Sequence, residues 1–217
     1  MDTATMLSML GSGAIISLEV FFITLIGSLP LGLLVSMGRM SRFKPLSWLV
    51  RAYISIMRGT PLMLQLFVVY FGPFYIFGIQ INNDYRLIAT SIAFILNYAA
   101  YFAEIYRSGI ESIPRGQYEA ADVLGYSRAQ RFFRIVLPQV FKRVLPPITN
   151  EVITLVKDTS LAFAIGVAEM FTTAKALAAS QVSMMPFIYA AVFYYIFNAL
   201  VAWAMSFIEK KMSYYHE

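Results

Sequence analysis

The sequence predicts an all-α integral membrane protein with five transmembrane helices and a structured cytoplasmic loop. Three observations lead to this class. Hydrophobic residues make up 59% of the 217 residues, only 13% are charged, and the mean hydropathy is +0.66. The apolar residues gather in five long runs with few charges, and the basic residues gather in particular connections between these runs. Such a composition excludes a disordered chain, a fibrous repeat and most soluble folds.

A helix needs about 20 mainly apolar residues to cross a hydrocarbon core about 30 Å thick. The first run, residues 11–38, meets this length and has Glu19 as its only charged residue. The second run, residues 61–81, contains no charge. The third, residues 87–103, is also uncharged but slightly short, so we expect it to take additional length from its flanks.

The fourth and fifth runs complete the predicted set. Residues 144–168 form the fourth, which is interrupted by Glu151, Lys157 and Asp158. The fifth helix occupies the C-terminal part of the uncharged run 176–208. Pro186 is expected to open that helix, because proline is tolerated in a first turn and not in a helix interior. The five spans are assigned to one transmembrane domain, residues 1–217.

The distribution of basic residues predicts the orientation of the chain. Fourteen of the 17 Lys and Arg residues lie in the first-to-second connection, the third-to-fourth connection and the C-terminal tail. The opposite connections carry only Arg86 and Lys175. Because basic residues are enriched in cytoplasmic loops, the N-terminus is expected outside and the C-terminus in the cytoplasm. Arg51 and Arg58 are expected to reach the cytoplasmic headgroups.

The third-to-fourth connection, residues 107–143, is too polar for a span and is patterned as two short helices. Residues 116–124 predict the first helix, and Gly125 predicts its left-handed end. Ser127 predicts the N-cap of the second helix, with a glutamine three residues later at the capping-box position, and Pro138 is expected to end it. The apolar residues of this second helix exceed what the loop can bury, which indicates a protein partner or, alternatively, an anionic lipid surface.

This loop resembles the EAA signature of ABC importer permeases. The matching positions are Glu119, Ala120, Ala121, Gly125, Ile135, Leu137 and Pro138. Residues 58–62 (RGTPL), 97–104 (NYAAYFAE) and 157–161 (KDTSL) resemble segments of the polar amino acid permease subfamily of these importers. The resemblance covers roughly residues 14–212, almost the whole chain.

The resemblance implies a type I ABC importer permease fold in which residues 107–143 form a coupling loop on a cytoplasmic ATPase. It implies that Glu119, Ala120 and Ala121 face the ATPase and that Gly125 makes the turn. It also implies that Leu137 and Pro138 end the element near the membrane. The chain lacks the phosphate-binding signature G-x-x-x-x-G-K-S/T, so ATP and magnesium are expected on the partner ATPase. This chain is therefore expected to bind no cofactor and to have no catalytic residue.

The resemblance also implies a set of partners. In that family, two permease subunits surround a shared path, with two ATPases on the cytoplasmic side and a solute-binding protein outside. The chain is accordingly expected to be a multi-pass permease subunit of a bacterial cell membrane that moves a polar amino acid into the cytoplasm. Its second permease subunit is either identical or a homologue. Membrane lipid is an expected partner, and nucleic acid is not.

The first group of candidate substrate residues lies on the third span. Asn97, Tyr101 and Glu104 fall at i, i+4 and i+7, which places them on one helical face. Glu104 would take an ammonium or a cationic side chain, Asn97 would bond a carboxylate, and Tyr101 would pack on the body of the substrate. The alternative is hydrogen bonding between helices, with Glu104 paired to Arg107.

A second group of candidates lies on the fourth span, where Asp158 and Ser160 are the expected substrate contacts. Four polar residues share a helical face there: Asn150, Thr154, Lys157 and Asp158. Lys157 and Asp158 either form a fixed ion pair or line the substrate path. Thr159 and Ser160 are expected to interrupt the helix and to free backbone groups for a ligand.

Two other classes of protein compete with this interpretation. An ion-coupled secondary amino acid carrier would use Glu104, Lys157 and Asp158 as an ion relay, but the EAA segment and the lack of an inverted repeat disfavour it. A membrane enzyme is disfavoured because the chain has no cysteine and a single histidine, His216. Cationic amino acids, glutamine, glutamate and cystine all remain open as substrates.

Overall fold

The computed structural model describes residues 2–212, which form helices and short connections without a strand. The longer elements are α1 (Thr3–Arg39), α2 (Lys44–Gly59), α3 (Leu62–Phe77), α4 (Tyr85–Glu111), α7 (Leu137–Asp158), α8 (Met170–Gln181) and α9 (Met185–Met212). The shorter ones are α5 (Arg115–Val123), α6 (Arg128–Arg131), the π-helical η1 (Phe132–Val136) and the 3-10 helix η2 (Thr159–Ile165). The all-α class is confirmed.

The predicted number of spans agrees with the structure when bent helix pairs are counted. Three helices, α1, α4 and α9, are each long and apolar enough to cross a membrane. Two further helix pairs are long and apolar enough only when each pair is taken together: α2 with α3, bent by 110°, and residues 128–165 with α8, bent by 58°. Counting each bent pair as one span gives five.

The uncharged run 176–208 is divided between α8 and α9 at Val182, which takes a left-handed conformation with φ of 48°. The prediction that the fifth helix occupies the C-terminal part of this run is confirmed, since α9 begins at Met185. Pro186 does lie in the first turn of α9, as expected. In addition, most of the predicted first-to-second connection is the amphipathic helix α2.

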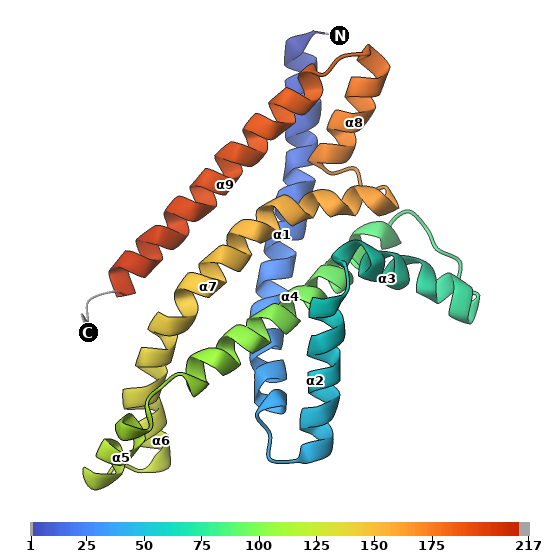
Figure 1. Ribbon diagram of the computed structural model, residues 1–217. Coiled ribbons are helices and arrows are strands. Elements are labelled where there is room, and N and C mark those ends of the chain that lie inside the picture. Colours follow the sequence, from blue (N-terminus) through green and yellow to red (C-terminus); the bar gives the residue numbers. More distant parts are fainter. Residues whose placement is uncertain (1, 213–217) are drawn as a thin grey trace.

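The long helices pack around α1 and α4, which cross near the centre of the molecule (Figure 1). A buried core joins these two helices to α3, α7 and η2, with Phe21, Leu66, Phe94 and Leu155 among its members. α9 packs on α7 and α8 at the side of this core. None of the residues in its apolar central part is fully buried: one side, including Phe197 and Val201, packs against the core, and the other is exposed.

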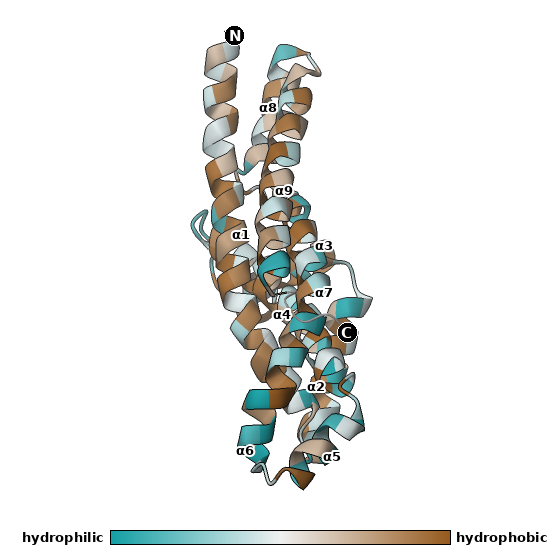
Figure 2. Ribbon diagram, turned by 90° about the vertical axis from the view of Figure 1, so that its left-hand side faces the viewer, coloured by the Kyte–Doolittle hydropathy of each residue, from teal (hydrophilic) through white to brown (hydrophobic). Residues whose placement is uncertain are grey.

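The basic connections gather at one end of the molecule. The α1–α2 turn and the α5–α6 segment lie there, whereas the N-terminal end of α1 and the α8–α9 connection lie at the opposite end (Figure 1). Figure 2 shows hydrophobic residues along most of the long helices and hydrophilic residues concentrated near α5 and α6. The fold therefore separates a basic end from the apolar body of the spans.

Candidate functional site

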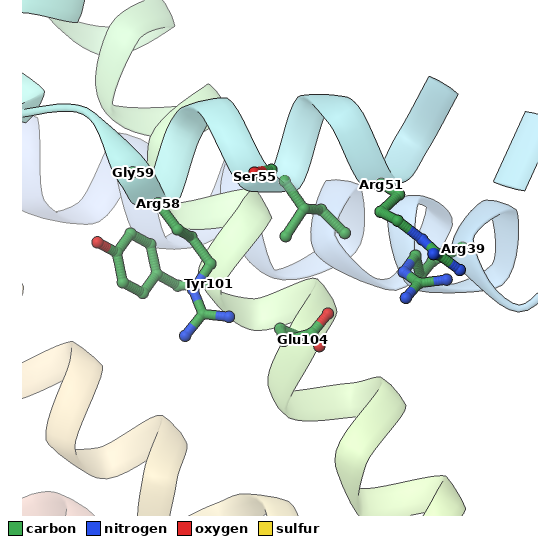
Figure 3. A pocket seen from close by; sticks show the side chains of 8 residues that line it. Arg39, Arg51, Ser55, Arg58, Gly59, Tyr101 and Glu104 are labelled. Carbon is green, nitrogen blue, oxygen red and sulfur yellow. The ribbon is translucent and has the colours of Figure 1, made fainter. Parts of the chain in front are cut away.

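A polar pocket of about 480 Å³ lies between the end of α1, α2 and α4 (Figure 3). α1 contributes Arg39, α2 contributes Arg51, Ile54, Ser55, Arg58 and Gly59, and α4 contributes Tyr101 and Glu104. A larger pocket of about 620 Å³ lies between α1, α7 and α9, but Ser17 is the only polar side chain among its lining residues. The first pocket is therefore the better candidate for a polar ligand.

Arg58 and Tyr101 form one wall of the polar pocket. The guanidinium carbon of Arg58 lies 5.2 Å from the centre of the Tyr101 ring. A cation at this distance over an aromatic face is attracted by the electrons of the ring. The Arg58 side chain is exposed and turns over Tyr101 at the end of α2.

Glu104 lies in the same pocket but is already paired. The Arg107 Nε atom donates to Glu104 Oε1 at 3.0 Å, and Arg107 Nη2 donates to the same oxygen. The ion pair between Glu104 and Arg107 that the sequence offered as an alternative is thus present. Three guanidinium groups line the pocket (Arg39, Arg51 and Arg58) against this single neutralised carboxylate, so the pocket has an excess of positive charge.

Asn97 shares a helical face with Tyr101 and Glu104 but does not line the polar pocket. It is buried, and its Nδ2 atom donates to the Met57 carbonyl at 3.0 Å and to Gln65 Oε1 at 2.9 Å. Gln65 in turn donates to the carbonyls of Met57 and Thr60 at 2.9 and 3.1 Å. Asn97 and Gln65 together satisfy the backbone carbonyls at the break between α2 and α3.

Asp158 and Ser160 lie at the junction of α7 and η2, apart from the polar pocket. The Tyr98 hydroxyl donates to Asp158 Oδ2 at 2.7 Å, and the Ser160 hydroxyl donates to the Lys157 carbonyl at 2.7 Å. The ion pair between Lys157 and Asp158, one of the two alternatives, is not formed, because neighbouring residues on a helix point in different directions. Thr159 begins a 3-10 helix, so the backbone tightens at the expected interruption and remains helical.

The α5–α6 segment has the two short helices that the sequence predicts. α5 agrees with the predicted helix to within one residue, and Gly125 has a φ of 74°. Ser127 and Gln130 form the expected capping box at the start of α6. An ion pair between Arg131 and Asp122 braces the two helices against each other.

The surface of this segment is partly apolar. Val123 and Leu124 are 88% and 73% exposed, and Phe133 is 65% exposed. Glu119 and Ala120 are exposed beside them, but Ala121 is only 1% exposed. The expectation that Ala121 faces a partner is therefore wrong in this structure, because its side chain points into the protein.

The expected end of the second loop helix at Pro138 is wrong. The backbone stays helical from α6 through η1 into α7, and Pro138 lies in the first turn of α7. The Leu137 N–H donates to the carbonyl of Phe132, five residues back, which is the π-helical pattern. A widened turn just before the proline accommodates the residue that cannot donate a hydrogen bond. Leu137 and Pro138 therefore connect the loop to the membrane helix without interruption.

Glu169 is a buried carboxylate that sequence reasoning missed. It caps α8 by accepting from the N–H groups of Phe171 and Thr172, each at 2.7 Å, and from the Tyr194 hydroxyl of α9 at 3.1 Å. It lies one residue beyond the predicted fourth span. Glutamate is not among the residues preferred at an N-cap, so its type gave little sign of this role.

The described residues contain no cluster of His, Asp, Glu or Cys that could hold a metal ion. His216 lies outside the described residues.

Comparisons with known proteins agree on one family. The chain matches the family described as binding-protein-dependent transport system inner membrane component over residues 28–214. An L-cystine transport system permease protein of Bacillus subtilis (strain 168) is 37% identical, covering 95% of this chain and 87% of its own length. An arginine transport system permease protein of the same organism is 37% identical over 92% of this chain and 90% of its own. A glutamate/aspartate import permease protein of Escherichia coli O157:H7 is 32% identical over 92% and 91%.

Solved structures show the same fold. A crystal structure of an amino acid ABC transporter with histidines has a TM-score of 0.87 and 30% sequence identity, covering 97% of this chain and 99% of that chain. An inward-facing structure of the MetNI methionine ABC transporter has a TM-score of 0.76 and 21% identity, covering 98% and 100%. At that lower identity, the likeness concerns the fold alone.

Proposed function

The chain belongs to the family of binding-protein-dependent transport system inner membrane components, and we propose that it is the membrane-spanning permease subunit of an ABC importer for an amino acid. The match over residues 28–214 is the observation that carries this proposal. The relatives named for cystine, arginine and glutamate/aspartate transport support an amino acid as the substrate. Nothing in the comparisons favours the ion-coupled carrier.

The proposed complex contains two ATPase subunits, a second permease subunit and a solute-binding protein outside the membrane. One helical face supports the second permease subunit: Asn150, Thr154 and Lys157 are exposed along α7. Polar side chains on a membrane helix avoid lipid, so this face would meet another subunit or a water-filled path. ATP would drive the change of access by binding more tightly to the closed ATPase pair than to the open pair.

The proposed docking site for the ATPase is the α5–α6 segment. Glu119 and Ala120 are exposed, and Val123 and Leu124 add apolar area beside them. Exposed apolar residues rimmed by polar ones are typical of a protein interface. Gly125 would set the angle between α5 and α6, while Leu137 and Pro138 would transmit movement of the loop directly into α7. ATP and magnesium would be held by the ATPase, leaving this subunit without a catalytic or cofactor-binding role.

The proposed substrate site is the polar pocket on α2 and α4. Arg58 would bind the substrate carboxylate through paired hydrogen bonds, and Tyr101 would pack on the body of the amino acid. Both bonds from Arg107 end on Glu104 Oε1, so Oε2 would accept from the substrate ammonium. Asn97 would act indirectly, because its hydrogen bonds to Met57 and Gln65 would fix the α2–α3 break beside the pocket.

Asp158 and Ser160 are proposed as a second group of substrate contacts along the path. Asp158 is partly buried beside Tyr98, and it continues the polar face of α7 toward η2. An ionisable residue inside a span defaults to a functional role, which supports this assignment.

The test is amino acid uptake into vesicles that contain the chain with its ATPase and solute-binding protein. We expect uptake to require ATP, Glu119→Lys to abolish ATPase coupling, and Glu104→Ala to reduce uptake while the complex still assembles. Arg58→Gln should also reduce uptake, by about tenfold or more if it removes a charge-assisted pair. Uptake by the chain alone, driven by an ion gradient, would show that it is a secondary carrier.

A further inference from the structure

A second polar pocket lies on the other side of Arg51, near the turn between α1 and α2. It has a volume of about 320 Å³ and is lined by Ser41, Lys44, Ser47, Trp48 and Arg51. Lys44, Trp48 and Arg51 are spaced at i, i+4 and i+7 on α2, so they share one face of that helix. This pocket is separate from the proposed substrate site except for the shared Arg51.

The geometry of the turn fixes the polar groups of this pocket. The Ser47 hydroxyl donates to the Arg39 carbonyl at 2.8 Å, which ties the start of α2 to the end of α1. The Ser41 Oγ atom accepts from the Phe43 N–H at 3.2 Å, which leaves the Ser41 hydroxyl hydrogen free to donate. The pocket thus presents one hydroxyl donor and two cationic side chains.

No carboxylate balances these two charges. The residues that line the pocket include no acidic side chain. Within residues 2–212, neither Lys44 nor Arg51 forms an ion pair, whereas Arg107 and Arg131 do. Two cations and a hydroxyl around one small space match an anion with several oxygens, and a phosphate has this chemistry.

The surroundings of the pocket indicate that the phosphate belongs to a lipid. Trp48 is 71% exposed, and the neighbouring Phe43 and Leu49 are exposed to similar extents. A soluble anion would leave these side chains in water, whereas a phospholipid would cover them with its glycerol and acyl groups. Tryptophan is enriched at the level of the headgroups, and basic residues beside a span attract anionic lipid.

We propose that Lys44 and Arg51 bind the phosphate of an anionic phospholipid at the membrane face where the α1–α2 turn lies. Ser41 donates a hydrogen bond to that phosphate, and Trp48 packs beside the glycerol. The bound lipid neutralises the basic residues at the start of α2 and anchors this helix, which also carries Arg58 of the substrate pocket.

The chain offers a direct spectroscopic test because it has only two tryptophans, Trp48 and Trp203. Trp203 is exposed on α9, so Trp203→Phe leaves Trp48 as the single tryptophan at small structural cost. This parent variant is placed, alone and assembled with its ATPase, in phosphatidylcholine vesicles. Brominated phosphatidylglycerol or brominated phosphatidylcholine is then added, and quenching of Trp48 fluorescence is measured.

We expect brominated phosphatidylglycerol to reach half-maximal quenching at a mole fraction about tenfold lower than brominated phosphatidylcholine. Lys44→Gln with Arg51→Gln should abolish this preference. Arg42→Gln is the matched control, because Arg42 lies in the same turn without lining the pocket, and the preference should persist.

Three results would overturn the proposal. The first is equal quenching by the two brominated lipids in the Trp203→Phe parent. This result would be decisive without any further variant. The second is displacement of phosphatidylglycerol by millimolar glycerol 3-phosphate, which would make the pocket a site for a soluble anion. The third is loss of quenching by both lipids when the ATPase is bound, which would make this surface a protein interface.

Discussion

Single glycines allow the closest contact between helices in this protein. A Cβ atom at Gly32 of α1 would lie 2.8 Å from the Cβ of Phe102 and 3.1 Å from the carbonyl oxygen of Ala99, both on α4. Neither atom is at the flexible end of a side chain, so the helices themselves would have to separate. Membrane helices commonly use small residues in this way, because close packing replaces the hydrophobic driving force that water provides.

Replacing Gly32 by alanine should therefore destabilise the protein. We expect a loss of about 1–3 kcal/mol from overpacking, which exceeds the gain of about 0.5–1 kcal/mol that alanine gives in a helix. The matched control is Gly11→Ala in the same helix, where an added Cβ meets nothing within 4 Å and should stabilise. Thermal unfolding in detergent measures both. Equal midpoints for the two variants would contradict the close contact.

Residues on one helical face of α4 have different tasks. Asn97 bonds the α2–α3 break, Tyr101 packs under Arg58, and Glu104 pairs with Arg107. Helical spacing places these three side chains on the same side of α4, and the neighbouring helices decide what each one contacts. A shared face is therefore a weaker indication of a shared function than its regularity suggests.

At the scale of elements, the turn between α5 and α6 fixes the shape of the proposed docking loop. Gly125 takes a positive φ, and the Tyr126 N–H that follows donates to the Ala121 carbonyl at 3.1 Å. This bond closes the end of α5 in a left-handed turn, where a side chain is disfavoured by roughly 1–2 kcal/mol.

Gly125→Ala should consequently alter the angle between α5 and α6 and weaken coupling. We expect substrate-stimulated ATP hydrolysis by the assembled transporter to fall several-fold, while the ATPase subunit alone keeps its own activity. Gly116→Ala adds the same methyl group to the same loop at a position with ordinary φ and open space, so hydrolysis should stay near that of the parent. If both variants hydrolyse ATP like the parent, the left-handed turn has no part in coupling.

At the scale of the whole molecule, the connections that are rich in Lys and Arg lie at one end of the fold. The α1–α2 turn and the α5–α6 segment lie at the same end of the molecule, opposite the α8–α9 connection (Figure 1). Because basic loops stay on the cytoplasmic side, we propose that the α5–α6 end faces the cytoplasm and the N-terminus faces outward.

The lack of cysteine makes this orientation simple to measure. Leu124→Cys and Met184→Cys each introduce one thiol, at positions that are 73% and 69% exposed at opposite ends of the molecule. In intact cells, a membrane-impermeant maleimide should label Met184→Cys and leave Leu124→Cys unlabelled until the membrane is permeabilised. The reverse pattern would invert the proposed topology.

The sequence alone determined the features that depend on composition and short spacing. These are the all-α membrane class, the two short loop helices, the left-handed turn at Gly125 and the capping box at Ser127. Each follows from residues within a few positions of one another, because helix caps, turns and the length of an apolar run are local properties.

Only the tertiary structure decided the features that depend on where helices cross. It brought Arg39, Arg51 and Arg58 around Tyr101 and Glu104. It also made Tyr98, and not the adjacent Lys157, the hydrogen-bond partner of Asp158. In addition, it set α2 at a sharp angle to α3 at Gly59–Thr60, just before the predicted second span, and it buried Glu169 at the start of α8. In each case the deciding partner lies on another helix, and the distance between residues on different helices is set by the packing of the whole fold.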